Sequence, residues 1–278
     1  EGRGGLRDIH TMVWLASVRM RKRHFDHLEE ILNTEDFYKL TRAYDFLLKV
    51  RFCLHILSGR RNDILSFEFH DPIARMLFFK ESKRFFASER FMRYLYLKTS
   101  IINTIASGSL DIFSNPPKGP DDMRESRGIH FLYARKKITE DFFLSKNRIV
   151  TNRDGFKDSP EKILEAFSVF SKTGKRFSPR LKEMIRKNLF RIGGKTRNSL
   201  RALESFLTVI RGDRVYETLR EMHTSGVLGR FIPEFGALSF LVVYEPYHRY
   251  TVDEHTLNGI RKLDELRTTR YKNLEHPS

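Results

Sequence analysis

Cysteine is almost absent from this sequence, and long apolar runs are absent altogether. A single cysteine, Cys53, occurs among 278 residues, which excludes the disulfide framework of a small secreted domain and favours a reducing cytoplasm. The longest uncharged apolar stretch runs only from about Gly236 to Tyr244, whereas a helix that spans a bilayer needs about 20 such residues. The first residues show no secretory signal. We therefore expect a cytoplasmic protein without a membrane-spanning segment.

Acidic residues are scarce relative to basic ones. The chain has 51 Lys and Arg against 35 Asp and Glu, a formal net charge of +16. This excess of positive charge indicates the kind of partner and not the fold. The partner could be nucleic acid, a nucleotide phosphate, an acidic protein face or acidic parts of a larger assembly. Apolar residues make up 40% of the chain, with 24 Phe and 10 Tyr. That content is sufficient for a folded core in about two domains.

Apolar residues recur at spacings of three and four along most of the chain, which predicts helices. In the first, from Leu6 to about Arg23, we expect Trp14 and Leu15 to be buried. The other expected helices cover approximately residues 36–58, 72–78, 82–107, 160–172, 179–188, 196–211 and 214–224. Lys98 is expected on the outer face of the helix over 82–107.

Capping signals mark several helix ends. Asp71, Ser159 and Ser178 each precede a proline, a pattern typical of an N-cap followed by the first helical residue. Gly59 stands where the helix over 36–58 is expected to stop. The prolines and glycine at 115–120 predict a linker. Beyond it, 129–134 and 137–144 have a composition that favours strands, so the predicted fold class is mainly α, a helical bundle with a small β insertion around 128–150.

Three short signals carry little functional information. His70-Asp71 is the doublet of HD phosphohydrolases, but a proline follows at once and a helix cap explains the aspartate better. Gly108-Ser109 begins like a nucleotidyltransferase loop, yet the aspartates at 121–122 are adjacent and would point to opposite faces of a strand. Basic helix faces with interleaved aromatics suit nucleic acid. Because the aromatics follow the apolar stripes, we expect them in the core.

Two longer motifs near the ends of the chain are far more specific. They are Gly4-Gly5-Leu6-Arg7-Asp8-Ile9-His10-Thr11 with Trp14 behind it, and Tyr247-His248-Arg249-Tyr250-Thr251-Val252-Asp253-Glu254-His255-Thr256-Leu257. Together they resemble the bacterial PII uridylyltransferase/uridylyl-removing enzymes, in which the first motif closes a nucleotidyltransferase domain and the second opens an HD domain. Between them, Arg51-Phe52-Cys53-Leu54-His55 and Val227-Leu228-Gly229 with Pro233 match the same family in order.

The resemblance implies the central helical part of a bifunctional nitrogen sensor. Such an enzyme moves UMP from UTP to a tyrosine of the signalling protein PII and hydrolyses that bond again, while further domains sense glutamine. The expected parts are the edge of a nucleotidyltransferase domain (1–30), a helical bundle (31–114), a linker with the β insertion (115–158), a helical segment (159–240) and the start of an HD domain (241–278). Since the chain opens on Glu1, we expect it to begin within a longer protein. The Asp-x-Asp pair of the transferase and the HD doublet that follows the second motif in the family are not in this sequence, so we expect the chain to be inactive alone.

The same resemblance nominates site residues. Gly4, Gly5 and Arg7 would bind nucleotide, because glycine lets the backbone approach a phosphate, although a plain turn explains the glycines equally well. Asp8 would add a third carboxylate for phosphoryl transfer; the alternative is that it only favours the start of a helix, as an acid in the first turn does. His255 matches the first HD metal ligand, or is a core histidine.

The geometry expected around His255 follows from the sequence as well. Thr251-x-x-Glu254 has the form of a capping box and starts a helix with His255 in its first turn. On that helix His255 is expected at the edge of the apolar stripe, where it can face inward.

The expected cofactor of the longer enzyme is Mg²⁺ or Mn²⁺, with UTP as substrate and no ion held tightly by this chain alone. The expected partners are PII and, through other domains, glutamine, with no membrane and no specific nucleic acid. Two alternatives stay open: a basic helical module that binds nucleic acid, and a nucleotidyltransferase relative with a substrate other than PII.

Overall fold

The computed structural model describes residues 4–20, 25–114, 136–151, 155–241 and 251–275. The chain divides into two compact units, one of residues 1–117 and 240–251 and the other of residues 118–239 and 252–278. Most described residues are helical and the strands are few and short, so the mainly α fold class is confirmed. None of the described helices combines the length and the apolar character that a membrane crossing requires.

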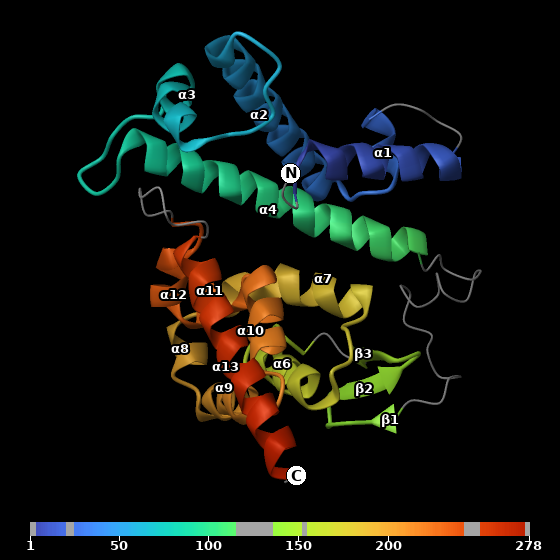
Figure 1. The fold of residues 1–278 in the computed structure, drawn as a ribbon. Helices are drawn as coiled ribbons and strands as arrows, with labels where there is room; N and C mark the ends of the chain where they lie inside the picture. Colours follow the sequence, from blue (N-terminus) through green and yellow to red (C-terminus); the bar gives the residue numbers. More distant parts are fainter. Residues whose placement is uncertain (1–3, 21–24, 115–135, 152–154, 242–250, 276–278) are drawn as a thin grey trace. The chain divides into compact units, whose positions relative to one another are not determined.

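The first unit is built on one long helix. Its elements are α1 (Leu6–Met20), α2 (Thr34–Ser58), α3 (His70–Met76) and α4 (Ala87–Ser114), with short 3₁₀ turns at Phe25–Glu30 and Phe67–Phe69. Helices α1, α2 and α3 all pack against α4 (Figure 1). Ile9 and Ile102 belong to the buried cluster beside α1, and Ile73 and Phe91 to the one beside α3.

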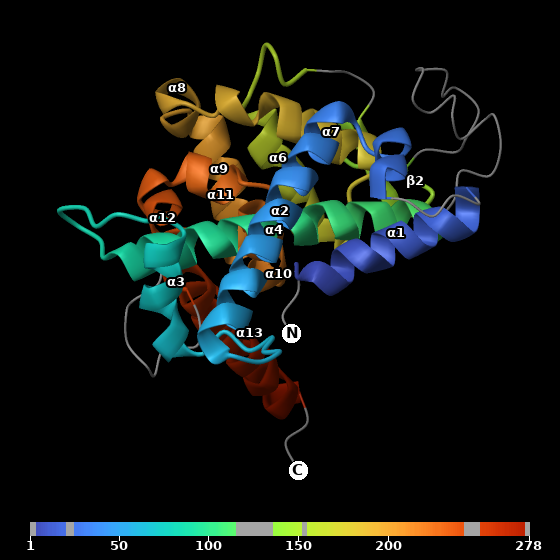
Figure 2. The ribbon, with the colours of Figure 1, turned by 90° about the horizontal axis from the view of Figure 1, so that it is seen from above.

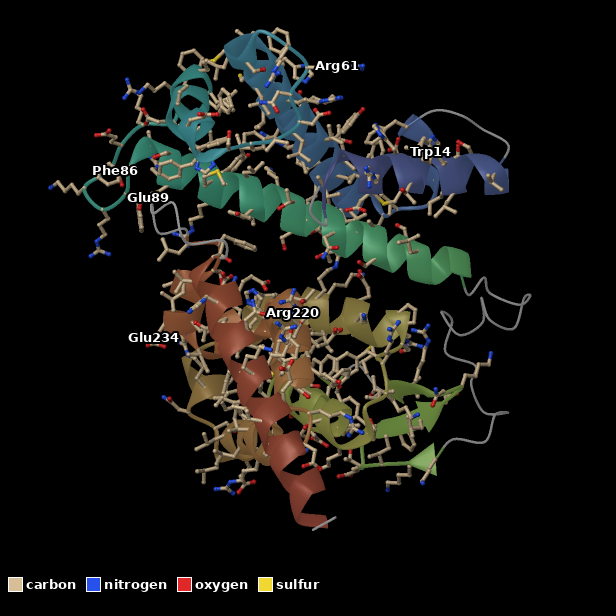
Figure 3. All side chains as sticks on the ribbon, viewed as in Figure 1. Trp14, Arg61, Phe86, Glu89, Arg220 and Glu234 are labelled. Atoms are coloured by element: carbon tan, nitrogen blue, oxygen red, sulfur yellow. The ribbon has the colours of Figure 1, made fainter. Side chains whose placement is uncertain are left out.

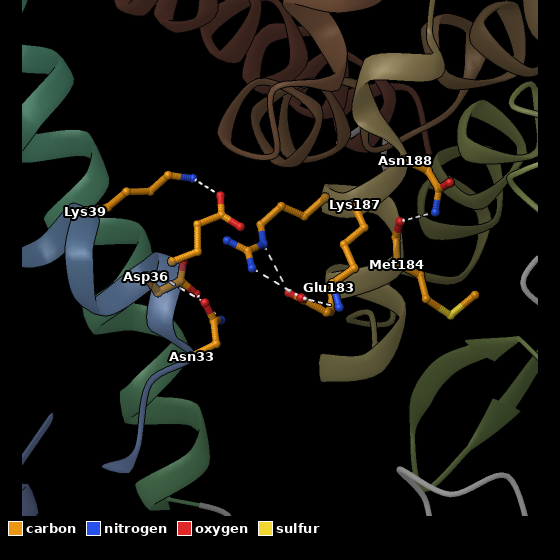
Figure 4. A network of polar contacts seen from close by, with 9 residues as sticks. Asn33, Asp36, Lys39, Glu183, Met184, Lys187 and Asn188 are labelled. Carbon is orange, nitrogen blue, oxygen red and sulfur yellow. Dashed lines mark hydrogen bonds and ion pairs between the residues drawn. The ribbon is translucent and has the colours of Figure 1, made fainter. Parts of the chain in front are cut away.

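The ends of α2 show why this helix begins and stops where it does. Asn33 accepts a hydrogen bond from the Asp36 N–H at 2.9 Å and donates one to the Asp36 carboxylate at 2.7 Å (Figure 4). Gly59 ends the helix with a φ of 63°, a left-handed conformation that glycine adopts without a steric cost. The expected stop at Gly59 is confirmed.

The second unit combines a small sheet with many helices. Its elements are β1 (Lys136–Lys137), β2 (Phe142–Ser145), β3 (Arg148–Thr151), α6 (Lys162–Thr173), α7 (Pro179–Asn188), a 3₁₀ turn (Leu189–Arg191), α8 (Gly194–Arg197), α9 (Leu200–Arg211), α10 (Val215–Thr224), α11 (Val227–Phe231), α12 (Pro233–Leu238) and α13 (Val252–Glu275). One core cluster runs through the unit, and Phe142, Phe167, Met222 and Leu257 are among its buried members.

The sheet is antiparallel with strand order β1-β2-β3. Phe143 lies opposite Val150, and the tight turn between the two strands uses Lys146 and Asn147, both with positive φ. Two consecutive residues with positive φ are the signature of a two-residue hairpin turn that matches strand twist. The expected strand over 137–144 is wrong in extent, because β1 stops at Lys137 and β2 begins only at Phe142.

Helix α7 shows a cap of the expected kind. Ser178 accepts a hydrogen bond from the Leu181 N–H at 3.2 Å, with proline at the first helical position, which confirms the prediction. Further along α7, burial resists ionisation of Glu183, but hydrogen bonds from Arg186 and Lys187 outweigh it and lower the pKa of this carboxyl (Figure 4). The helix is thus stabilised at its start by a side-chain cap and along its surface by ion pairs.

Two expected burial assignments are wrong. Trp14 is 66% exposed, because α1 turns Ile9, Met12 and Ala16 toward the core and Trp14 lies on the opposite side of the helix. Leu15 is only half-buried. Lys98, expected outside, is buried, and its ammonium lies 4.8 Å from the centre of the Tyr94 ring. A cation over an aromatic face is stabilised by the ring's quadrupole, which reduces the cost of burial.

Two expected caps are also wrong. Helix α6 begins at Lys162 with Glu161 as its N-cap, so Ser159 lies in the preceding turn, where its carbonyl accepts the Lys162 N–H at 3.1 Å. Helix α3 has Phe69 as N-cap. Asp71 instead lies in the first turn and forms an ion pair with Arg75 at 2.8 Å, a pairing that spacing of four residues on a helix permits.

The expectation that the aromatics are committed to the core holds only in part. Several are largely exposed, namely Trp14, Tyr38, Phe52, Phe78, Phe86 and Phe190. The linker expected at 115–120 and the strand expected at 129–134 lie outside the described residues.

Candidate functional site

The N-terminal motif forms a compact junction between a loop and α1. Gly4 has a φ of 82°, and a Cβ at this position would lie 1.9 Å from the backbone oxygen of Thr99 on α4. Its N–H donates a hydrogen bond to the carboxylate of Asp8. The left-handed backbone and the close approach to α4 both explain why this position needs glycine.

The neighbouring candidates belong to the same junction. The carbonyl of Gly5 accepts the Asp8 N–H at 3.1 Å. Arg7 lies exposed in the first turn of α1, and its carbonyl accepts the Thr11 hydroxyl at 2.9 Å. The structure therefore brings Gly4, Gly5, Arg7 and Asp8 together. The bond from Gly4 to Asp8 is the contact that an acid at a helix start makes, so it agrees with the interpretation of Asp8 as a helix-starting residue.

His255 lies elsewhere, in the first turn of α13, and its side chain is exposed. The expectation that it faces inward is wrong. Among the leucines of this helix whose exposure the structure describes, Leu257 is buried, whereas Leu263 and Leu266 are exposed like His255. The apolar residues of this helix therefore do not form one buried stripe, because Leu257 reaches the core and Leu263 and Leu266 do not.

The orientation of α13 is set by polar contacts with α10 that sequence patterns did not reveal. His223 Nε2 lies 3.2 Å from the Asp253 carboxylate, which is fully buried. Arg220, labelled in Figure 3, lies 2.5 Å from the Glu254 carboxylate. The helix starts where the sequence predicts, but the expected capping box is wrong: the Glu254 carboxylate pairs with Arg220 on another helix, and the Glu254 N–H donates to the Asp253 carboxylate at 3.0 Å.

The other end of the same helix pair is fixed in a similar way. The N–H of Tyr216 donates to the Asp264 carboxylate at 2.8 Å, and Arg267 donates to the Gly212 carbonyl at 2.8 Å. Tyr216 is in the first turn of α10, so Asp264 satisfies one of the N–H groups that a helix start leaves unpaired. Contacts at both ends and buried Leu257 between them fix the rotation of α13, and with it the direction of His255.

The Arg51-Phe52-Cys53-Leu54-His55 motif also gains a structural explanation. Arg51 makes two hydrogen bonds to the Asp63 carboxylate, at 2.7 and 3.1 Å, and His55 Nε2 lies 3.6 Å from the same group. The hydrogen bond from Arg51 lowers the pKa of Asp63. Spacing of four residues put Arg51 and His55 on one helix face, but no pattern indicated Asp63 as their shared partner.

The described residues do not by themselves fit a metal ion. No three His, Cys, Asp or Glu side chains come together in that part of the chain, whereas a catalytic metal typically takes about three protein ligands. The His70-Asp71 doublet does not form a metal site either, because the Asp71 carboxylate is paired with Arg75 at 2.8 Å.

Comparison with known families gives two matches in chain order. Residues 1–108 match the family model of the GlnD PII-uridylyltransferase, and residues 142–231 match that of the uridylyltransferase GlnD third domain. No solved structure matches the chain.

Curated relatives match along the whole chain. It is 31% identical over 282 residues to the bifunctional uridylyltransferase/uridylyl-removing enzyme of Erythrobacter litoralis and 30% identical over 281 residues to that of Novosphingobium aromaticivorans. The corresponding enzyme of Caulobacter vibrioides is 31% identical over 297 residues. Each alignment covers 100% of this chain and 30% of the relative. With two models of one family in order and full-length similarity to its members, the chain belongs to the GlnD PII-uridylyltransferase family.

Proposed function

We propose that this chain is the central part of a bifunctional enzyme that transfers UMP from UTP to the PII signalling protein and removes it again. The observation that carries the proposal is the similarity along the entire chain to enzymes named for both activities. The chain spans about 30% of the length of those relatives, so both activities belong to the longer protein. We place that protein in the cytoplasm.

In this proposal the two ends of the chain serve different reactions. Gly4, Gly5, Arg7 and Asp8 border the transferase centre, where Arg7 lies exposed in the first turn of α1 and its positive charge suits an anionic nucleotide. His255 serves the removal of UMP as one ligand of an HD-type metal site. It is supported by its exposed position on a helix whose rotation is fixed by α10. The described residues supply no complete ligand set, and Mg²⁺ or Mn²⁺ is proposed for the longer enzyme only.

The experiment is an assay of a longer natural protein that contains this chain. Purified enzyme is incubated with labelled UTP, a divalent metal and the PII protein of the same organism, and the label on PII is measured with and without glutamine. We expect the label to be transferred to PII in one of the two glutamine conditions and to be released from PII in the other. Transfer to another protein with PII left unlabelled would favour a relative with a different substrate.

A further inference from the structure

The connection between α3 and α4 presents aromatic side chains to solvent. We call residues 78–86 the 78–86 loop. Phe78 is 86% exposed and Phe86, at the other end, is 60% exposed. Between them Lys80, Lys83 and Arg84 are exposed as well. Large exposed apolar groups rimmed by charge typically mark an interaction surface.

Phe78 occupies a position where its side chain contributes little to the fold. Its φ is 60°, its N–H donates to the Arg75 carbonyl at 3.0 Å, and the next N–H, of Phe79, donates to Ala74 at 2.9 Å. This pair of bonds is the motif that ends a helix on a left-handed residue, which is usually glycine. Phe79 packs into the core beside Phe91, so burial of Phe79 leaves Phe78 pointing outward in a strained conformation.

Phe86 likewise occupies a position that suits another residue type. It immediately precedes α4, its carbonyl accepts the Arg90 N–H at 3.1 Å, and its N–H donates to the Glu89 carboxylate at 2.8 Å (Figure 3). It is therefore the N-cap of α4, where Ser, Thr, Asp or Asn would supply a side-chain oxygen that Phe lacks. Phe78 and Phe86, at the two ends of the loop, thus both occupy helix-capping positions that favour other residue types. Such departures are expected at functional sites.

The 78–86 loop is also held in shape. Arg90 donates to the Lys80 carbonyl at 2.6 Å. The Ser82 N–H donates to the Phe85 carbonyl at 2.9 Å, and the Phe85 N–H donates to the Ser82 hydroxyl at 3.1 Å. A loop fixed by its own bonds loses less conformational entropy on binding than a floppy one. Figures 1 and 2 show it extending beyond the ends of α3 and α4, so it is a projection and not a groove.

We propose that the 78–86 loop is a docking element that inserts Phe78 and Phe86 into apolar hollows of an acidic protein face. The loop carries three cations against one carboxylate, Glu81, so its charge complements an acidic partner. A partner protein is favoured because aromatic anchors surrounded by cations are typical of protein interfaces. Single-stranded nucleic acid is bound in grooves that stack successive bases, whereas this loop is a projection. The inference rests on the proposed function, in which the partner is the PII substrate.

The test compares binding of the chain to the PII protein of its own organism by titration calorimetry. One variant combines Phe78→Gly with Phe86→Ser, and another combines Lys83→Glu with Arg84→Glu. Matched controls are Phe52→Ser, at a phenylalanine that is also exposed, and Arg60→Glu with Arg61→Glu, at consecutive exposed arginines of the same unit. The same proteins are titrated with a single-stranded oligonucleotide and with phosphatidylserine vesicles.

We expect each loop variant to bind PII at least about tenfold more weakly, as loss of an aromatic or arginine anchor does, with the controls within about twofold of the original chain. The aromatic variant should at the same time have a Tm that is higher by about 2–4 °C, because both substitutions restore preferred capping residues. Weaker binding of PII together with a higher Tm would show that the variant has lost docking and not its fold.

Unchanged PII affinity in both loop variants would overturn the inference, as would an equal loss in the controls, no PII binding by the original chain, or effects confined to the oligonucleotide or the vesicles. Failure of the inference is distinct from failure of the proposed function, which is read from UMP transfer by the longer enzyme and does not depend on the loop variants.

Discussion

At the start of α1, the Asp8 carboxylate is tied to the N–H of Gly4, and Gly4 itself is pressed against the backbone of Thr99. Substitution of Asp8 by asparagine keeps an oxygen that can accept the Gly4 bond and removes only the charge. It therefore separates a catalytic carboxylate from a helix-starting one. An alanine would not, because it removes the bond as well.

In the longer enzyme we expect Asp8→Asn to reduce UMP transfer by about two orders of magnitude, a typical cost of losing one charge-stabilising group at a reaction centre. UMP removal and the Tm should change little. Both activities and the melting curve are measured on the same preparation. If transfer and removal decline together, Asp8 is a structural residue of the junction.

His255 can be replaced by alanine, because its side chain is exposed and contributes little to packing. His255→Ala should change the free energy of unfolding by no more than about 0.5 kcal/mol, as surface substitutions usually do. In the longer enzyme it should abolish UMP removal and leave UMP transfer intact. Metal content, urea unfolding and both activities are compared with the unaltered protein. Unchanged removal and metal content would end its assignment as a ligand.

Single residues were the least predictable level. Trp14 and Lys98 were placed on the wrong sides of their helices because periodicity gives the angle between residues but not the direction of the core. The pairs from His223 to Asp253 and from Arg51 to Asp63 join residues 30 and 12 positions apart, and neither spacing is a local signal. Gly4 and Asp8 were singled out only because their motif resembles a known family, and the hydrogen bond between them was not predicted although it spans four residues.

At the scale of elements, the long helices were well predicted, whereas the short helices α11 and α12 were missed and helix ends were placed less accurately. The expected helix over 36–58 corresponds to α2 (Thr34–Ser58), and the one over 214–224 to α10 (Val215–Thr224), since both have long apolar stripes. The strands were poorly placed because a two-residue strand such as β1 is defined by its pairing with β2 and carries no periodicity of its own.

The pairing of α10 with α13 leads to a prediction at the same scale. Asp253 is fully buried and accepts from the Glu254 N–H at 3.0 Å while it faces His223. Asp253→Ala should lower the free energy of unfolding by about 2–4 kcal/mol, because it strips the buried partner from His223 and a bond from the helix start. Arg220→Ala, at a partly exposed pair, should cost only about 0–1 kcal/mol.

Urea unfolding of both single variants and of Asp253→Ala combined with His223→Ala measures the coupling between the buried pair. We expect a coupling energy of about 0.5–3 kcal/mol, the range for residues in direct contact. Additive effects of the two substitutions, or a cost for Asp253→Ala no larger than for Arg220→Ala, would mean that the buried pair does not fix α13.

For the whole molecule, the net charge of +16 is the dominant physical property. Burial of the aromatics does not exclude specific nucleic-acid binding, because Trp14, Phe52 and Phe190 are exposed. The placement of these rings bears on it instead. Trp14 stands on α1, Phe52 on α2 and Phe190 on the 3₁₀ turn after α7, so each of these rings is carried by a different element, whereas proteins that bind single strands stack successive bases on their aromatic side chains.

We therefore expect any binding of DNA or RNA to be sequence-blind and governed by phosphate contacts alone. Such binding releases counterions, and its affinity should fall at least about tenfold between roughly 50 and 200 mM salt. The measurement is fluorescence anisotropy with two labelled oligonucleotides of equal length and unrelated sequence across that salt range. Equal affinities that decline in parallel would agree with a charge that serves protein partners. Tight binding near 200 mM that distinguishes the two sequences would instead support the nucleic-acid module, because base contacts are far less sensitive to salt than phosphate contacts.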